Sequence, residues 1–133
     1  MTTTLTQTWN REREESTRRS RVTAGVLWAL QIVSAIVFLM AGGSKLAGVP
    51  MMVQMFGVIG IGQWFRYVTG TIEVVSAVLL LIPSVAAYGA AALAVTMIGA
   101  IVTHLFIVGG SPLMPIVLLA STVTIAWARR SGR

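Results

Sequence analysis

Long apolar segments without charged side chains constrain the fold of this chain more than any other feature. The first of them runs from Val22 to Gly43 and contains no acidic or basic residue. A helix needs roughly 20 apolar residues to cross a hydrocarbon core about 30 Å thick, so this segment suffices for one membrane span. Of the 133 residues, 56% are hydrophobic and only 11% are charged, which is outside the usual balance of soluble domains. We therefore predict an all-α integral membrane protein.

Proline and glycine divide the remaining apolar sequence into three further predicted helices. The breaks fall at Pro83-Ser84 and at the run from Gly109 to Pro112, because proline lacks the N–H that a helix interior uses and glycine weakens a helix. Together with the first segment, these breaks predict a bundle of four transmembrane helices, at about residues 22–43, 66–82, 85–108 and 112–128.

The distribution of basic residues predicts the topology of this bundle. Arginines gather within residues 11–21 and 129–133, with only Lys45 and Arg66 between these clusters. Basic segments that flank membrane spans stay in the cytoplasm, and four spans place both clusters there, whereas five spans would separate them. The uncharged segment 46–65 is then an interfacial or re-entrant segment on the outer side.

The predicted domains follow from this topology. Residues 1–20 form a polar cytoplasmic tail, residues 21–128 form the membrane domain, and residues 129–133 form a basic cytoplasmic end. In the tail, Glu14 with Arg18 and Glu15 with Arg19 have the i,i+4 spacing that supports a solvated helix, but we expect a frayed tail. The net charge of +6 lies at the ends of membrane segments, so it indicates contact with the lipid bilayer and its anionic lipids, and no nucleic-acid partner is expected.

The composition also limits the cofactors that the chain can hold with its own side chains. There is no cysteine, which excludes disulfides, iron–sulfur clusters and thiolate metal ligands. The single histidine cannot ligate a haem from both sides. We expect no metal site, haem or iron–sulfur cluster.

The few polar residues of the apolar segments are candidate site residues. In the predicted topology, Glu73 and His104 lie at similar depth near the outer side, and Lys45 and Arg66 lie at helix ends on that same side. An ionised side chain in hydrocarbon costs about 2.5–3.5 kcal/mol at a helix centre, so such residues usually pair or serve a function. Glu73 can form a structural ion pair with Arg66 or Lys45, or it can serve a ligand or proton transfer. His104 can be a hydrogen-bonded histidine at the membrane interface, or it can have a functional role.

Small and polar residues form stripes at helical spacing, and these stripes are expected to face the bundle interior. One stripe runs from Gln31 through Gly42 to Lys45, and another includes Gly70 and Glu73. Small residues allow membrane helices to approach closely.

From the polar residues of the apolar segments, we assign Glu73 and His104 as candidate catalytic residues. The candidate ligand-binding residues are Lys45, Arg66, Gln31 and Trp64.

Several motifs resemble those of one family. The stretch Ala41-Gly42-Gly43-Ser44-Lys45-Leu46-Ala47-Gly48 resembles the AG-x-x-KL-x-G signature that closes the first helix of DoxX-like membrane proteins. Similar landmarks follow in order, namely Phe56, Trp64-Phe65, Gly70-x-x-Glu73, Pro83 and Thr103-His104. The resemblance covers about Leu27 to Trp127. The resemblance implies a four-helix protein of the bacterial cytoplasmic membrane, in a family whose founding members are subunits of thiosulfate:quinone oxidoreductase.

Three functions remain open at this point. The first is an accessory, redox-associated membrane subunit with an outer-leaflet polar pocket, for which a quinone is the candidate ligand and oxidoreductase subunits are the candidate partners. The second is a small membrane enzyme, an isomerase, hydrolase or cyclase, in which Glu73 acts as general acid or base on an apolar small molecule. The third is a purely structural helix bundle, and self-association into a homo-oligomer is compatible with all three.

Overall fold

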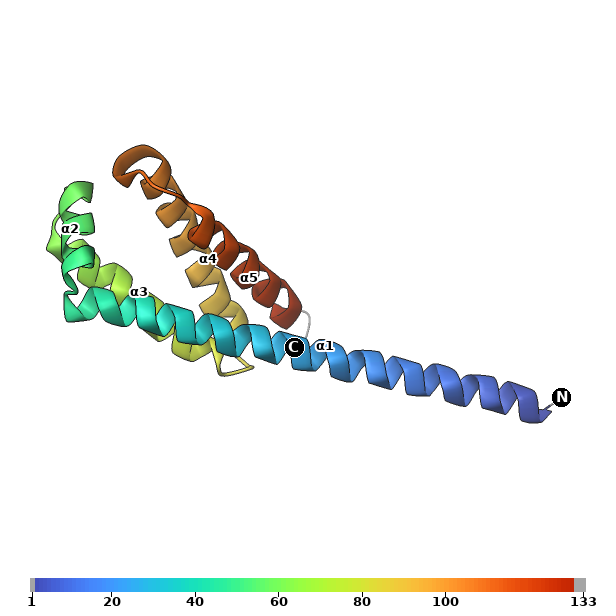
Figure 1. The fold of residues 1–133 in the computed structure, drawn as a ribbon. Helices are drawn as coiled ribbons and strands as arrows, with labels where there is room; N and C mark the ends of the chain where they lie inside the picture. Colours follow the sequence, from blue (N-terminus) through green and yellow to red (C-terminus); the bar gives the residue numbers. More distant parts are fainter. Residues whose placement is uncertain (1, 131–133) are drawn as a thin grey trace.

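The computed structural model describes residues 2–130, and all regular elements within them are helical (Figure 1). The elements are α1 (Thr2–Ala47), α2 (Pro50–Ile59), α3 (Gln63–Leu80), α4 (Ala86–Thr103), the π-helical turn η1 (His104–Val108) that continues α4, and α5 (Leu113–Arg130). The prediction of an all-α fold is confirmed.

The helices end where the proline and glycine residues predict. α3 ends at Leu80, and a turn that contains Pro83 leads into α4. Between η1 and α5, Gly109 and Gly110 have φ values of +79° and +81°, a backbone conformation that residues with a side chain rarely adopt. The segment 46–65, predicted as an outer-side connection, contains the short helix α2, which starts at Pro50, where a missing N–H is tolerated.

α1 is one continuous helix of 46 residues, and its first half projects beyond the other helices (Figure 1). At 1.5 Å per residue it is about 69 Å long, more than twice the thickness of a hydrocarbon core. Residues 4–26 are all exposed. The tail, for which the sequence favours a frayed segment, is therefore the start of α1 instead, because the polar residues continue the helix of the first apolar segment.

Three helical segments of the described chain are long and apolar enough to cross a membrane: residues 4–47, residues 86–108 and α5. This chain is thus a membrane protein by the length and composition of its helices. α3 has the same length as α5 but carries Gln63, Arg66 and Glu73, and it is not among these three. A fourth span through α3 stays a prediction.

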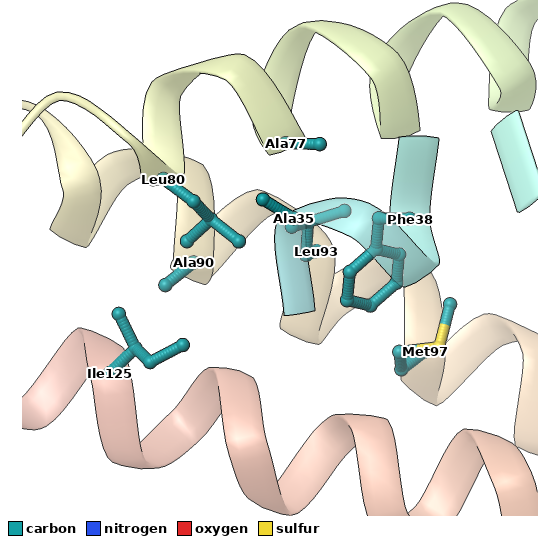
Figure 2. Close-up of a cluster of buried hydrophobic side chains, with 8 residues drawn as sticks. All are labelled: Ala35, Phe38, Ala77, Leu80, Ala90, Leu93, Met97 and Ile125. Carbon is teal, nitrogen blue, oxygen red and sulfur yellow. The ribbon is translucent and has the colours of Figure 1, made fainter. Parts of the chain in front are cut away.

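The four long helices pack in chain order, α1 on α3, α3 on α4 and α4 on α5, and α5 returns to α1 (Figure 1). A cluster of buried apolar side chains joins them (Figure 2). The cluster comprises Ala35 and Phe38 of α1, Ala77 and Leu80 of α3, Ala90, Leu93 and Met97 of α4, and Ile125 of α5. Each long helix therefore contributes to a single core.

Glycines let two pairs of helices approach closely. A methyl group at Gly42 of α1 would lie 2.8 Å from Val74 Cγ2 and 2.9 Å from the Gly70 carbonyl oxygen of α3. A methyl group at Gly89 of α4 would lie 2.7 Å from the Ser76 carbonyl oxygen. All three distances are shorter than real Cβ contacts. For the predicted stripes that contain Gly42 and Gly70, the prediction that they face the bundle interior is confirmed here.

Candidate functional site

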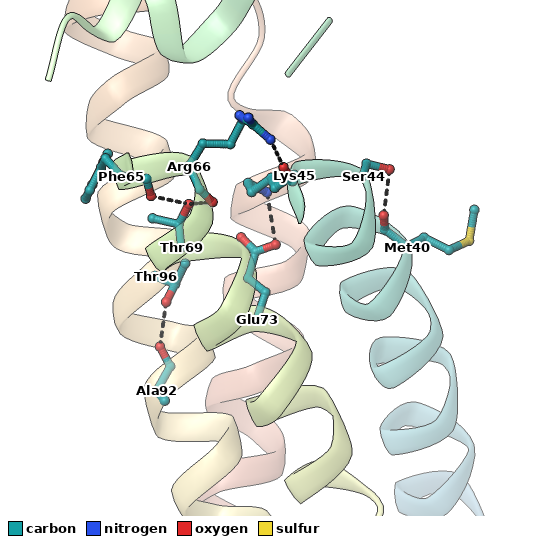
Figure 3. Close-up of polar contacts among 9 residues, drawn as sticks. All are labelled: Met40, Ser44, Lys45, Phe65, Arg66, Thr69, Glu73, Ala92 and Thr96. Atoms are coloured by element: carbon teal, nitrogen blue, oxygen red, sulfur yellow. Dashed lines mark hydrogen bonds and ion pairs between the residues drawn. The ribbon is translucent and has the colours of Figure 1, made fainter. Parts of the chain in front are cut away.

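An ion pair between α1 and α3 is the centre of the candidate site. Glu73 of α3 is only 2% exposed, and its Oε2 lies 2.9 Å from Nζ of Lys45, which is 13% exposed (Figure 3). Within residues 2–130, the salt bridge that the structure contains is this one between Lys45 and Glu73. Of the two partners that the sequence leaves open for Glu73, the structure pairs it with Lys45.

The glycine contact between α1 and α3 positions this ion pair. Gly42 precedes Lys45 by three residues and Gly70 precedes Glu73 by three, so each glycine lies one turn from the charged residue on the same helix face. A methyl group at Gly70 would lie 3.0 Å from Lys45 Cβ and 3.1 Å from the Gly42 carbonyl oxygen. Close contact of the two backbones brings the carboxylate and the ammonium group within reach of each other.

Arg66 lies near the C-terminal end of α1 in the same helix pair but does not pair with Glu73. Its side chain is 4% exposed. Nε donates to Gln63 Oε1 at 2.8 Å. Nη1 donates to the carbonyl oxygen of Lys45 near the end of α1, as Figure 3 shows. The guanidinium carbon also lies 4.4 Å from the centre of the Tyr67 ring. Arg66 therefore satisfies a terminal carbonyl of α1 and brings a second positive charge close to Lys45.

Gln63 belongs to this site, although the sequence-based candidates omit it. Its amide oxygen accepts from Arg66, and its Nε2 donates to the Val53 carbonyl oxygen of α2 at 3.1 Å. Gln63 thereby ties α2 to the polar cluster. The signal in the sequence is its position three residues before Arg66, which places both on one helix face. We refer to Lys45, Gln63, Arg66 and Glu73 as the α1–α3 polar cluster.

Three of the predicted site residues, His104, Trp64 and Gln31, lie outside this cluster. His104, at the junction of α4 and η1, is hydrogen-bonded through Nδ1 to the Ala100 carbonyl oxygen of its own helix at 2.9 Å. Trp64 is 60% exposed, and its Nε1 donates to the Ile61 carbonyl oxygen at 3.2 Å. Within residues 2–130 neither side chain forms a hydrogen bond with Glu73, so for His104 the geometry fits the hydrogen-bonded histidine that the sequence also allows.

Gln31 is buried at the opposite end of the bundle from Lys45. The two lie 14 residues apart on α1, which corresponds to about 21 Å. Gln31 Nε2 donates to the Leu80 carbonyl oxygen at 2.7 Å, and its Oε1 accepts from Arg129 Nε at 2.7 Å. The structure thus places Gln31 in a second polar cluster and not with Glu73.

The α1–α3 polar cluster has the chemistry of a site for a hydrogen-bond acceptor. Two cations and one carboxylate leave it with a formal charge of one positive unit. Among residues 2–130, acceptors engage Nε and Nη1 of Arg66 and one direction of Lys45 Nζ, so donors remain on both side chains. In the same part of the chain, no group of three His, Cys, Asp or Glu side chains is arranged to hold a metal ion.

Comparison with known proteins gives two matches. The model of the DoxX-like family matches residues 29–126. Among curated proteins, the one named "Putative oxidoreductase CatD" from Bacillus subtilis (strain 168) is 34% identical over 74 residues, which is 56% of this chain and 55% of that protein. The chain thus spans about half the length of the curated relative that it matches. No solved structure matches.

Proposed function

Since the chain belongs to the DoxX-like family, we propose that it is a redox-associated membrane subunit that binds a quinone-class ligand at the α1–α3 polar cluster. The observation that carries this proposal is the set of spare N–H donors on Lys45 and Arg66 beside a buried carboxylate. The name of the B. subtilis relative, which contains the word oxidoreductase, supports the redox association.

The donor set suits the carbonyl oxygens of a quinone. A quinone carbonyl accepts hydrogen bonds, and donors on charged groups form the stronger ones. Arg66 Nη2 has no hydrogen-bond partner within residues 2–130. The buried side-chain atom without a partner in these residues is Arg129 Nη2, so Arg66 Nη2 is not fully buried and can be reached. The residues Lys45 and Arg66 would donate to the ligand, and Glu73 would hold Lys45 in position through the 2.9 Å contact.

An accessory role follows from the chemistry that the side chains lack. With no cysteine and one histidine, the chain supplies no iron–sulfur cluster and no bis-histidine haem. Electron transfer to a bound quinone, which would supply the redox chemistry, therefore requires a partner subunit that carries a redox group. The contribution of this chain is to bind and orient the lipid-soluble ligand.

The proposed setting is the bacterial cytoplasmic membrane. The helices α1, α3, α4 and α5 would form four spans, with both termini in the cytoplasm, because the arginine clusters flank the first and last of them. The α1–α3 polar cluster and α2 would then lie toward the outer face. Glu73 tolerates this depth because its charge is compensated by Lys45.

Equilibrium binding tests the proposal. Decylubiquinone, titrated into the purified chain in detergent micelles, should quench tryptophan fluorescence saturably. Changing Lys45→Met and Glu73→Gln together removes both charges of the ion pair, and it should weaken binding about tenfold or more, the effect of losing one charge-assisted hydrogen bond. Glu12→Gln, on the exposed part of α1, is the control and should bind like the wild type.

Two results would contradict the proposed ligand. Quenching that does not saturate means that no site exists, and saturable quenching that is unchanged in the double variant places the site elsewhere. Turnover of an apolar substrate by the purified chain alone, lost in Glu73→Gln, would favour the alternative of a small membrane enzyme.

A further inference from the structure

A second polar cluster lies at the end of the bundle where α1 emerges from it. Gln31 satisfies the Leu80 carbonyl oxygen near the C-terminal end of α3, and this bond orients its own amide oxygen toward Arg129 Nε. The guanidinium carbon of Arg129 also lies 5.2 Å from the centre of the Trp28 ring. Two neutral side chains of α1, one of them hydrogen-bonded to α3, thus hold the Arg129 side chain of α5 in place.

The charge of Arg129 has no counter-ion within residues 2–130. The sequence has four acidic residues. Glu73 pairs with Lys45, and the other three lie between positions 12 and 15, on the exposed first half of α1. Arg129 Nη2 is, moreover, a buried nitrogen of the described chain without a hydrogen-bond partner. A guanidinium group that is partly removed from water without a counter-ion is unfavourable, so an anion beside it would stabilise this end of the bundle.

The neighbouring face of α1 offers both space and a second cation. Arg21 precedes Trp28 by seven residues, which is about two turns, so both lie on one face of the helix. Between them are Ala24 and Gly25, and a methyl group at Gly25 would meet no atom within 4 Å. Small residues therefore leave room between Arg21 and the ring against which Arg129 rests.

We propose that Arg129 and Arg21 bind an anionic phosphate group at this end of the bundle, supplied by a phospholipid headgroup. Phosphate accepts hydrogen bonds from guanidinium N–H groups, and because Nε donates to Gln31 and Nη2 is buried, Nη1 is the Arg129 nitrogen that would reach the headgroup. The headgroup would occupy the space beside Ala24 and Gly25, and its acyl chains would follow the apolar surface of α1 from there toward Ala47. Free phosphate has the same chemistry and is the other source that an experiment must distinguish.

Native mass spectrometry of the full chain in detergent tests this site. Phosphatidylglycerol should bind about fivefold more tightly than phosphatidylcholine, the effect expected of one basic residue near an anionic headgroup. Arg129→Gln should remove this preference. Arg130→Gln is the matched control and should keep it, because Arg130 is exposed and stacks on Trp127, with 4.1 Å between the guanidinium carbon and the ring centre.

A second variant pair keeps the test valid if Arg129→Gln fails to fold. Arg21 lies on the exposed part of α1, so Arg21→Gln cannot open the core, and it should lower phosphatidylglycerol binding about fivefold relative to Arg11→Gln. Equal losses in Arg21→Gln and Arg11→Gln, or in Arg129→Gln and Arg130→Gln, would overturn the site. If inorganic phosphate alone displaces phosphatidylglycerol and raises the melting temperature in an Arg129-dependent manner, the site stands and its ligand is free phosphate.

Discussion

Removing the charge of Lys45 should destabilise the bundle more than removing the charge of Glu73. The two variants Lys45→Met and Glu73→Gln each break the same 2.9 Å ion pair, but they leave different groups behind. The first leaves a carboxylate that is 2% exposed, and the second leaves an ammonium group on a side chain that is 13% exposed. The difference in burial predicts the order of the two effects.

The magnitudes follow from the fate of the remaining charge. A buried charge left without its partner costs about 3–5 kcal/mol, and we expect about 3 kcal/mol of lost unfolding free energy for Lys45→Met. In Glu73→Gln the amide oxygen still accepts a hydrogen bond from Nζ, and the flexible lysine can extend toward the interface. We expect a loss of about 1–2 kcal/mol for that variant.

The double variant Lys45→Met with Glu73→Gln measures the pairing directly. It leaves no charge unpaired, so it should be more stable than Lys45→Met alone, with a coupling energy of about 2 kcal/mol. The unfolding free energies can be measured by titrating dodecyl sulfate into dodecyl maltoside micelles, with far-UV circular dichroism as the signal. Glu12→Gln, exposed on α1, is the control and should stay within about 0.5 kcal/mol of the wild type.

Two outcomes would refute this reasoning. If Lys45→Met unfolds at the same dodecyl sulfate fraction as the wild type, then the carboxylate of Glu73 reaches water in the micelle. If the loss in the double variant equals the sum of the two single losses, then the contact between Nζ and Oε2 does not stabilise the fold.

Three further predictions concern packing, the second polar cluster and topology. Gly42→Ala should lose about 1–3 kcal/mol of unfolding free energy because its methyl group meets α3. Gly43→Ala, whose methyl group would meet no atom within 4 Å, should be neutral or slightly stabilising. Equal effects of the two variants on thermal melting would contradict the close contact. Gln31→Leu should lower the melting temperature, since it leaves the Arg129 Nε and a carbonyl oxygen without their partner, and an unchanged melting curve would show that water replaces the amide. Reporter tags at both termini should be found in the cytoplasm and a tag within residues 48–62 outside, while termini on opposite sides would require an odd number of spans.

Much of the helix pattern could be predicted from the sequence because it depends on local properties. Proline and glycine end helices through their own backbone chemistry, so the breaks after Leu80 and at Gly109 were accessible. The small-residue stripes were accessible as well, since residues three and four apart share a helix face. The i,i+4 pairs of Glu14 with Arg18 and Glu15 with Arg19 indicate a helix in the polar segment, but the expectation of a frayed tail was wrong, because exposed ion pairs are too weak to predict that the helix continues to Thr2.

The candidate site was predicted only in part. Depth in the membrane follows from sequence position, and similar depth predicts that Lys45, Arg66 and Glu73 lie at one end of the bundle, where the structure has them. Equal depth also predicts that His104 lies beside them, but depth does not specify the direction in which a side chain points, and His104 bonds to a carbonyl oxygen of its own helix. Depth therefore suggests neighbours without establishing contacts.

The sequence by itself determined that the chain is a helical membrane protein, where most of its helices break, which helix faces are buried and which family it belongs to. These properties depend on the solvent preference of segments and on spacing along one helix. The tertiary structure alone decided that Glu73 pairs with Lys45 and not with Arg66, and that Gln31 meets Arg129 at the far end of the bundle. The reason is geometric, because partners on different helices are chosen by the rotation and the close approach of those helices, and the glycine contact that sets both for α1 and α3 exists only once they pack.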